Sequence, residues 1–257
     1  MEAWFISDIH LKTAEERNGQ ILLRFLRSLL ETSGPDGRTK TAPKQIHLFL
    51  LGDIFDLWIG GSTFFADQFK DLMNALEQFI KAGGRVTYIE GNHDVHIERY
   101  FQKKLGAEVF VEAQYYTIDG LKVRVEHGDL INLNDIKYLK YRSIIRNPLL
   151  KPLSYLIPGW FWSHVGNKAS KKSRAKSGQY RVQNEDQLIG MIRHHIPRAY
   201  NEGPFDLIIS GHMHVFDDHT VKIQNHEVRS INLGSWFEEE VRVFRLKDGK
   251  GEWIKIS

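Results

Sequence analysis

Residues 45–56 read QIHLFLLGDIFD, an apolar run followed at once by Gly52, Asp53 and Asp56. A short apolar run without alternation is typical of a strand that is buried on both faces of a sheet. The acidic residues then fall where that strand ends. The same order, an apolar strand followed by Asp, Asn or His, recurs four more times in the chain and decides the fold that we predict.

Between these strands the apolar residues recur at helical spacing, so helices are expected over 15–31 and 66–82. The first strands are expected at 2–7, 45–51 and 85–90, and the polar stretch 32–44 is expected to be a surface loop. Strand, helix, strand, helix, strand in this order predicts parallel strands with helices packed on a sheet. Further strands are expected at about 108–111, 113–118, 121–126, 206–210, 215–221, 226–233, 238–245 and 252–256.

Residues 135–200 interrupt this pattern, because strand signals vanish there and apolar residues recur at helical spacing. We therefore predict an α/β core made of 1–134 and 201–257, with 135–200 inserted as a helical cap. The length of 257 residues fits one large domain with such an insertion.

The composition limits the classes of protein that remain. With 42% hydrophobic and 26% charged residues the chain resembles an ordinary globular protein rather than a disordered one. It has no cysteine, which excludes a disulfide scaffold, a thiolate-bound metal and a thiol nucleophile. No apolar stretch reaches the ~18–20 residues that a membrane span needs, and the first residues do not resemble a signal peptide. A cytoplasmic protein is expected.

Five polar motifs follow five of the expected strands. They are Asp8-Ile9-His10, Gly52-Asp53-Ile54-Phe55-Asp56, Gly91-Asn92-His93-Asp94, His127-Gly128-Asp129 and Gly211-His212-Met213-His214. Each motif alone is also compatible with an ordinary turn. Because ligands of α/β proteins gather at the carboxyl ends of strands, five such motifs in this order are expected to converge on one site.

The donor atoms in these motifs indicate a metal site. Carboxylate, imidazole and amide oxygen without thiolate suit Mn²⁺, Fe²⁺ or Zn²⁺. In Asp8-x-His10 and His212-x-His214 the alternating residues can face one ion, and the two oxygens of Asp53 can bridge two. Two ions ~3.5–4 Å apart hold a phosphate and deprotonate a water near neutral pH.

This ordered set of motifs resembles that of the calcineurin-like metallophosphoesterase superfamily, from Asp8 to His214. The resemblance implies a four-layer α/β/β/α sandwich with a dinuclear metal site. It implies that Asp8, His10, Asp53 and His214 hold one ion, and that Asp53, Asn92, His127 and His212 hold the other. It also places His93, together with Asn92, beside the phosphate as a catalytic residue. Asp56, Asp94 and Asp129 are expected to orient the ligands rather than bind an ion.

The cap is expected to determine the substrate, because the superfamily core serves many phosphoesters. Between Asp135 and Val182 there are eleven Lys or Arg and one acidic residue, a net charge of +10, whereas the whole chain carries +3. Many large apolar residues are interspersed with these cations. A basic and apolar helical segment favours an anionic substrate with acyl chains, or an anionic membrane surface. Packing of the cap on the core accounts for some of the apolar residues but not for the imbalance of charge.

Within the superfamily the layout resembles the UDP-2,3-diacylglucosamine hydrolase family of lipid A biosynthesis. The run Gly52 to Gly60 and the spacing of Asp135, Tyr138 and Arg142 carry this resemblance. It implies cleavage of UDP-2,3-diacylglucosamine to UMP and 2,3-diacylglucosamine 1-phosphate with two Mn²⁺ ions, at the cytoplasmic face of the inner membrane. The candidate substrate-binding residues are Asp135, Tyr138, Arg142, Asn167, Ser170, Lys171 and Arg174. Well-known members of the family have Arg at the position of His93.

Two other functions remain open from the sequence. One is a metallophosphoesterase for another phospholipid or a soluble nucleotide, and the other is an inactive scaffold of the same fold. Nucleic acid is not an expected partner, because the basic residues are interspersed with large apolar ones in the cap and form no continuous stripe on the core.

Overall fold

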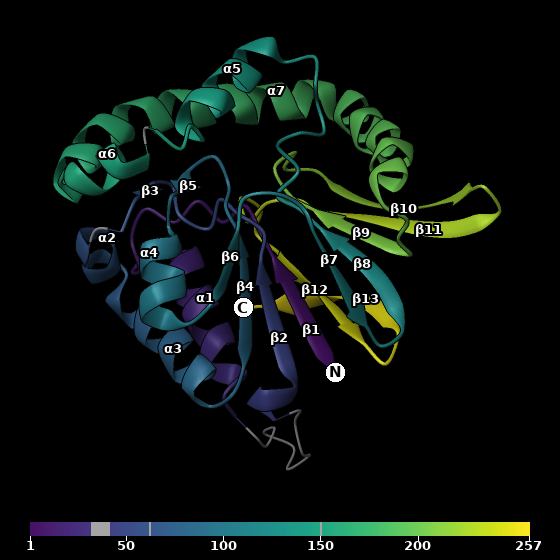
Figure 1. The fold of residues 1–257 in the computed structure, drawn as a ribbon, viewed down its shortest axis with the longest axis horizontal. Helices are drawn as coiled ribbons and strands as arrows, with labels where there is room; N and C mark the ends of the chain where they lie inside the picture. Colours follow the sequence, from purple (N-terminus) through teal and green to yellow (C-terminus); the bar gives the residue numbers. More distant parts are fainter. Residues whose placement is uncertain (32–41, 62, 150) are drawn as a thin grey trace.

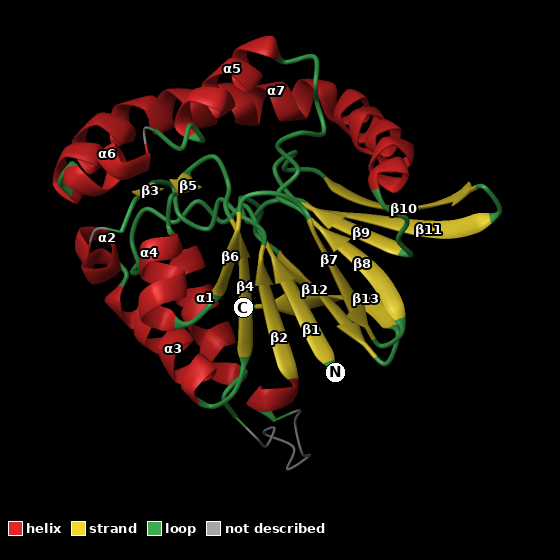
Figure 2. Ribbon diagram, viewed as in Figure 1, coloured by secondary structure: helices red, strands yellow, loops and turns green. Residues whose placement is uncertain are grey.

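A computed structural model covers the chain and describes residues 1–31, 42–61, 63–149 and 151–257. For 163 and 165–183 it describes the helical backbone but not the side chains. Two large sheets lie face to face, with helices around them and a helical segment across one end (Figures 1 and 2). The predicted α/β class is confirmed.

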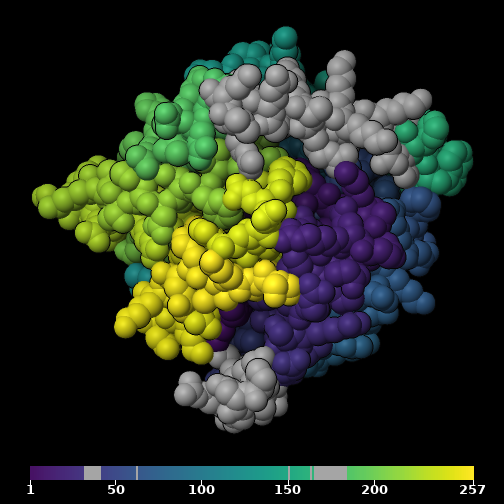
Figure 3. All heavy atoms as spheres, turned by 180° about the vertical axis from the view of Figure 1, so that it is seen from behind, coloured from purple at the N-terminus to yellow at the C-terminus, as the bar shows by residue number. Residues whose placement is uncertain are grey.

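The first sheet has the strand order β13-β12-β1-β2-β4-β6. Its strands are β1 (Glu2–Ile6), β2 (Ile46–Leu50), β4 (Arg85–Ile89), β6 (Glu108–Phe110), β12 (Val241–Lys247) and β13 (Lys250–Ile256). The strands β1, β2, β4 and β6 are parallel, as the alternation of strands and helices predicts, whereas β12 pairs with β1 antiparallel. Segments from the beginning and the end of the chain are therefore neighbours, and Figure 3 shows the purple N-terminal and yellow C-terminal segments side by side on the back of the molecule.

The second sheet has the order β10-β11-β9-β8-β7. Its strands are β7 (Gln114–Ile118), β8 (Leu121–Val125), β9 (Leu207–Ser210), β10 (Phe216–Ile223) and β11 (His226–Leu233). Side chains such as Phe5, Phe49, Ile231 and Phe244 from both sheets form one buried cluster between them. Two further strands of two residues each, β3 (Trp58–Ile59) and β5 (Asp94–Val95), pair beside the site.

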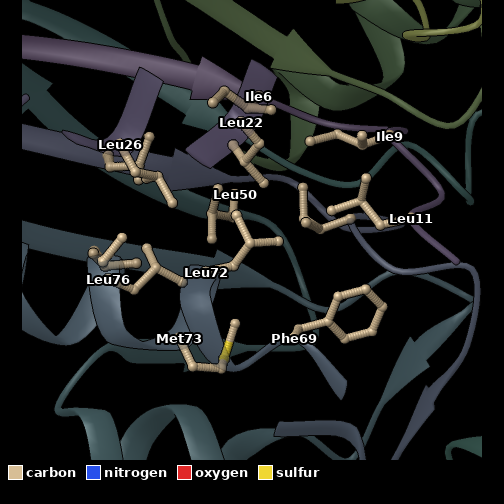
Figure 4. Close-up of a cluster of buried hydrophobic side chains, with 14 of the residues drawn as sticks. Ile6, Ile9, Leu11, Leu22, Leu26, Leu50, Phe69, Leu72, Met73 and Leu76 are labelled. Carbon is tan, nitrogen blue, oxygen red and sulfur yellow. The ribbon is translucent and has the colours of Figure 1, made fainter. Parts of the chain in front are cut away.

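Helices α1 (Arg17–Ser28) and α3 (Lys70–Lys81) cover the outer face of the six-stranded sheet. In Figure 4 Leu22 and Leu26 of α1 and Leu72 of α3 meet Ile6 and Leu50 of the sheet. The predicted helix 66–82 is divided at Phe69 into α2 (Thr63–Gln68) and α3. The short helix α4 (Glu98–Tyr100) and the helical turn Phe101–Leu105 (η2) complete this layer. Another short helical turn, Pro43–Gln45 (η1), precedes β2.

The inserted segment forms α5 (Ile136–Ile145), α6 (Lys151–Leu156) and the long α7 (Gly159–Glu202). Asn184 has a non-helical backbone (φ −137°), so that α7 bends there. Beyond the bend, Ile196, Ala199 and Tyr200 pack on the outer face of the five-stranded sheet. The end of α7 thus supplies the fourth of the layers α/β/β/α, although these residues fall within the predicted cap 135–200. Among the described residues, no helix is both long and apolar enough to cross a membrane.

Candidate metal centre

All seven predicted ligands lie on loops that directly follow strands. Asp8 and His10 follow β1, Asp53 follows β2, Asn92 follows β4, His127 follows β8, and His212 and His214 follow β9. Three of these strands belong to one sheet and two to the other, so the loops meet where the ends of both sheets come together. The sandwich therefore brings the five motifs to one point.

The first group consists of Asp8, His10, Asp53 and His214, whose ligand atoms all lie within 4.8 Å of one another. Nε2 of His214 is 3.2 Å from Oδ1 of Asp8 and 3.1 Å from Nε2 of His10. Two imidazole nitrogens and a carboxylate oxygen this close, with Asp8 and His10 buried, form a donor set that fits a divalent cation.

The second group consists of Asp53, His127 and His212, again within 4.8 Å. Nδ1 of His212 is 3.2 Å from Nε2 of His127, and Oδ1 of Asn92 is 3.4 Å from the same nitrogen. The amide oxygen of Asn92 therefore lies beside this group. A second cation fits here with carboxylate, amide and imidazole donors.

Asp53 is the residue that the two groups share. Its Oδ2 is 3.8 Å from Nε2 of His10 and 3.8 Å from Nε2 of His127. Its Oδ1 accepts a hydrogen bond from the backbone N–H of His93 at 2.9 Å. One oxygen is therefore fixed by the protein, while the other lies midway between the two groups, as a bridging carboxylate requires.

Hydrogen bonds to backbone carbonyls fix which imidazole nitrogen carries the proton. Nδ1 of His127 donates to the carbonyl of Leu51 at 2.8 Å, so Nε2 of the neutral ring presents its lone pair to the site. Nδ1 of His93 likewise donates to the carbonyl of Asp56 at 2.8 Å. The structure also gathers Asp56, His93 and His10 into a third group, with the rings of His10 and His93 4.8 Å apart.

The charge states of Asp8 and His212 agree with cation binding. Burial raises the pKa of Asp8, but the hydrogen bond and charge of His214 lower it below its usual value. Burial, together with the nearby His127, lowers the pKa of His212 to about 4, so this ring is neutral at pH 7. Burial lowers the pKa of His127, but the charges of Asp53 and Asp8 raise it above its usual value. An ionised carboxylate and a neutral imidazole are the forms that bind metal ions.

Five of the seven residues have a left-handed backbone, which L-residues other than Asn and Asp seldom adopt. They are Asp8 (φ 52°), His10 (φ 55°), Asp53 (φ 53°), His212 (φ 66°) and His214 (φ 57°). Such conformations cost about 1–3 kcal/mol each and persist where the surrounding structure enforces them. The backbone of Gly91 is one of these neighbours, because it lies so close to Asp53 that a Cβ on Gly91 would be 2.1 Å from Oδ1 of Asp53.

The calcineurin-like phosphoesterase family model matches residues 1–216, which include every motif of this site. The chain belongs to the calcineurin-like phosphoesterase family. It is a metal-dependent phosphoesterase, and the two groups of donors described above fit divalent ions.

Curated relatives of this phosphoesterase match it over nearly its whole length. A UDP-2,3-diacylglucosamine hydrolase of Haemophilus influenzae is 26% identical over 98% of this chain and 97% of the relative. One of Pseudomonas aeruginosa is 29% identical over 92% of this chain and 91% of the relative. Among solved structures, Vps29 of Entamoeba histolytica is similar over all of both chains, with a TM-score of 0.39 and 13% identity.

The cap residues of the phosphoesterase contact the core beside the site. The side chain of Asp135 caps α5 by accepting from the backbone N–H of Tyr138 at 2.9 Å. The hydroxyl of Tyr138 and Nε of Arg142 both donate to Oδ2 of Asp129, at 2.8 and 2.7 Å. These contacts attach α5 to the loop that carries His127. The predicted substrate residues Asn167, Ser170, Lys171 and Arg174 lie outside the described side chains.

One buried residue that supports the site was missed by the sequence analysis. Asn232 of β11 is fully buried and donates from Nδ2 to Oγ of Ser210 at 3.0 Å and to the carbonyl of Gly211 at 2.8 Å. It thereby holds the start of the loop that bears His212. Its only sequence signal is a polar residue in an apolar strand, and its partner follows from the pairing of β11 with β9.

Proposed function

We propose that this phosphoesterase cleaves the pyrophosphate of UDP-2,3-diacylglucosamine to UMP and 2,3-diacylglucosamine 1-phosphate with two divalent ions, which we take to be Mn²⁺. The position of Asp53 supports hydrolysis with two ions, because its Oδ2 is equally distant from Nε2 of His10 in one group of donors and from Nε2 of His127 in the other. The names of the relatives and the composition of the cap carry the choice of substrate.

In this proposal Asp8, His10, Asp53 and His214 hold one ion, and Asp53, Asn92, His127 and His212 hold the other. Two divalent ions held there would polarise the phosphate and would lower the pKa of a water molecule toward neutral. Because Nδ1 of His93 is engaged by the carbonyl of Asp56, Nε2 is the atom left to contact the phosphate or protonate the leaving group. Asn92 adds its side-chain amide next to His93.

The cap supplies the remaining part of the substrate site. The basic residues of 135–182 suit the phosphates, and Arg142 and Tyr138 contact Asp129 in the loop that carries His127. Its apolar residues suit the acyl chains. Asp135, Asn167, Ser170, Lys171 and Arg174 are assigned to the substrate by the resemblance of the sequence alone. The division of the chain into core (1–134 and 201–257) and cap (135–200) is part of this proposal.

An acylated substrate should be strongly preferred over its deacylated form. Burying one methylene contributes about 0.8 kcal/mol, so even four methylenes in the cap correspond to roughly 100-fold in kcat/KM. We expect at least that ratio between UDP-2,3-diacylglucosamine and UDP-glucosamine, measured as UMP release in detergent. Equal values of kcat/KM for the two would favour the alternative of a soluble nucleotide substrate, and no release from either would favour the inactive scaffold.

Several large apolar side chains of the cap are exposed, which fits contact with an anionic bilayer. Leu149, Leu156 and Trp160 are 84%, 78% and 63% exposed, with Leu153 and Phe161 near them in sequence. Isolated exposed apolar residues are common, but this many in one basic segment favour peripheral binding to a membrane. We propose that the protein is cytoplasmic and binds the inner membrane through these cap residues.

Replacing Leu156 and Trp160 by Glu should lower the partition coefficient onto vesicles with 30% anionic phospholipid by about tenfold or more. The change removes two apolar contacts and adds like charge at the lipid surface. Co-sedimentation measures it, and binding of the unmodified protein should weaken as salt rises. Val111→Glu is the matched control, because Val111 is an exposed apolar residue of the core. Equal loss in this control, or salt-independent binding, contradicts the assignment.

A further inference from the structure

Helix α5 of the cap turns one row of residues toward the metal-binding loops. The row is Tyr138, Arg142 and Arg146, spaced four apart, which places them on one side of the helix. The first two contact Asp129, in the loop that carries His127. Arg146, at the end of α5, contacts a different loop, the one that carries Asn92.

The side chain of Arg146 is 9% exposed, and its two Nη atoms contact that loop. Its Nη2 donates to the backbone carbonyl of Gly91 at 2.7 Å and to that of Glu90 at 3.1 Å. Its Nη1 pairs with the carboxylate of Glu90, which is 1% exposed and also accepts from the backbone N–H of Ile97 at 2.8 Å. A planar fork of donors suits this simultaneous contact with two carbonyls and a carboxylate.

The peptide held by Arg146 immediately precedes Asn92, a proposed ligand. From the core side, Oδ1 of Asp94 accepts from the backbone N–H of Gly91 at 2.8 Å. Arg146 therefore fixes the carbonyl of Gly91 from the cap, while Asp94 fixes its N–H from the core. Between these two anchors the loop has little freedom, and the side chain of Asn92 reaches Nε2 of His127 at 3.4 Å.

We propose that Arg146 is a positioning residue of the metal centre: it holds the Gly91 peptide so that Asn92 meets the ion shared with His127. The cap then acts on the centre directly, in addition to its part in the substrate site. The inference rests on the dinuclear centre of the proposed function and does not depend on the identity of the substrate. Arg146 touches no reacting atom, so its effect is on metal affinity.

The test compares Mn²⁺ binding by calorimetry to the metal-free protein in three variants. In Glu90→Gln the charge of Glu90 is lost but Arg146 keeps both carbonyls, so both dissociation constants should stay within about threefold of wild type. In the double variant Glu90→Gln with Arg146→Met the carbonyl contacts are lost without leaving a buried carboxylate unpaired. One dissociation constant should rise about 10- to 100-fold and the other should not change, as expected for loss of a group that orients a ligand.

The third variant, Lys151→Met, removes another ion pair between cap and core, Lys151 Nζ to Glu98 Oε1 at 2.7 Å, and leaves the contacts of Arg146 with Gly91 and Glu90 in place. It should bind both ions as wild type does. Thermal unfolding of each metal-free variant shows that the double variant is folded. Wild-type affinity for both ions in the folded double variant overturns the inference, as does an equal loss in Lys151→Met. A wild-type protein that binds fewer than two ions overturns the dinuclear centre and this inference with it.

Discussion

Asp53→Asn is expected to lower kcat by at least about 10³-fold and to leave fewer than two Mn²⁺ ions bound per chain. The substitution preserves the shape of the side chain, and an amide oxygen can still accept from the backbone N–H of His93. The amide nitrogen then occupies the place of Oδ2, between Nε2 of His10 and Nε2 of His127. It removes the bridging charge and points N–H groups at two cations, so the stabilisation that two ions give to the reacting phosphate is lost.

A matched control for this prediction is Asp217→Asn. Asp217 is also buried, and its carboxylate is engaged by Arg193 at 2.8 Å, on β10 and outside the three groups of candidate metal-binding side chains. The control should retain both ions and a kcat within a few-fold of wild type. Metal content by atomic emission and UMP release under saturating substrate measure both quantities. An Asp53→Asn protein with two ions and nearly normal kcat is incompatible with a bridging role for Asp53.

Asp94→Ala should cost about 3–5 kcal/mol of the free energy of unfolding, the largest stability effect that we expect from a single substitution. The fully buried carboxylate accepts from the hydroxyl of Tyr88 at 2.6 Å and from the N–H groups of Gly91 and Ile54 at 2.8 Å each. A further N–H, that of Asp53, donates at 3.1 Å. Each buried donor left without a partner costs about 1–3 kcal/mol. The alanine leaves these four donors without an acceptor, besides the long contact from the Phe55 N–H at 3.5 Å, and the lower ends of the four costs sum to about 4 kcal/mol.

Urea unfolding of the metal-free proteins measures this cost without a contribution from metal binding. Burial and the nearby charge of Asp53 raise the pKa of Asp94 to about 7, so ionisation of this carboxyl opposes folding as the pH rises through 7. The comparison therefore belongs at pH 6, below that pKa. Tyr88→Phe removes one of the four donors and should cost only about 1 kcal/mol. If Asp94→Ala costs no more than Tyr88→Phe, Asp94 does not organise the loops of Asp53 and Gly91 as described.

The regular elements of the core could be predicted because their apolar runs are bounded by strong signals. The strand expected at 85–90 is β4 at Arg85–Ile89, with Gly83 before it and the Gly91 motif after it. The surface on which a helix packs is harder to predict than the helix itself. The apolar residues of 188–200 give a helical period, but the period does not say that they pack on the five-stranded sheet instead of within the cap.

The convergence of the candidate ligands could be predicted for a similar reason. Parallel strands bring the motifs that follow them to one end of a sheet, and the sequence shows five such motifs. The left-handed backbone of His212 and His214 could not be predicted from the sequence, because it depends on the packing of the loops around it. The role of Arg146 was hidden among the eleven cations of the cap, since charge counts do not distinguish an exposed guanidinium from one buried on the Glu90 carboxylate.

The most direct test of the account is a titration of the metal-free protein with Mn²⁺, with release of UMP from UDP-2,3-diacylglucosamine as the signal. Two ions bridged by Asp53 predict no release without metal and a maximum at two ions per chain. Full activity with one ion per chain, activity in the metal-free protein, or no UMP at any Mn²⁺ concentration would contradict it.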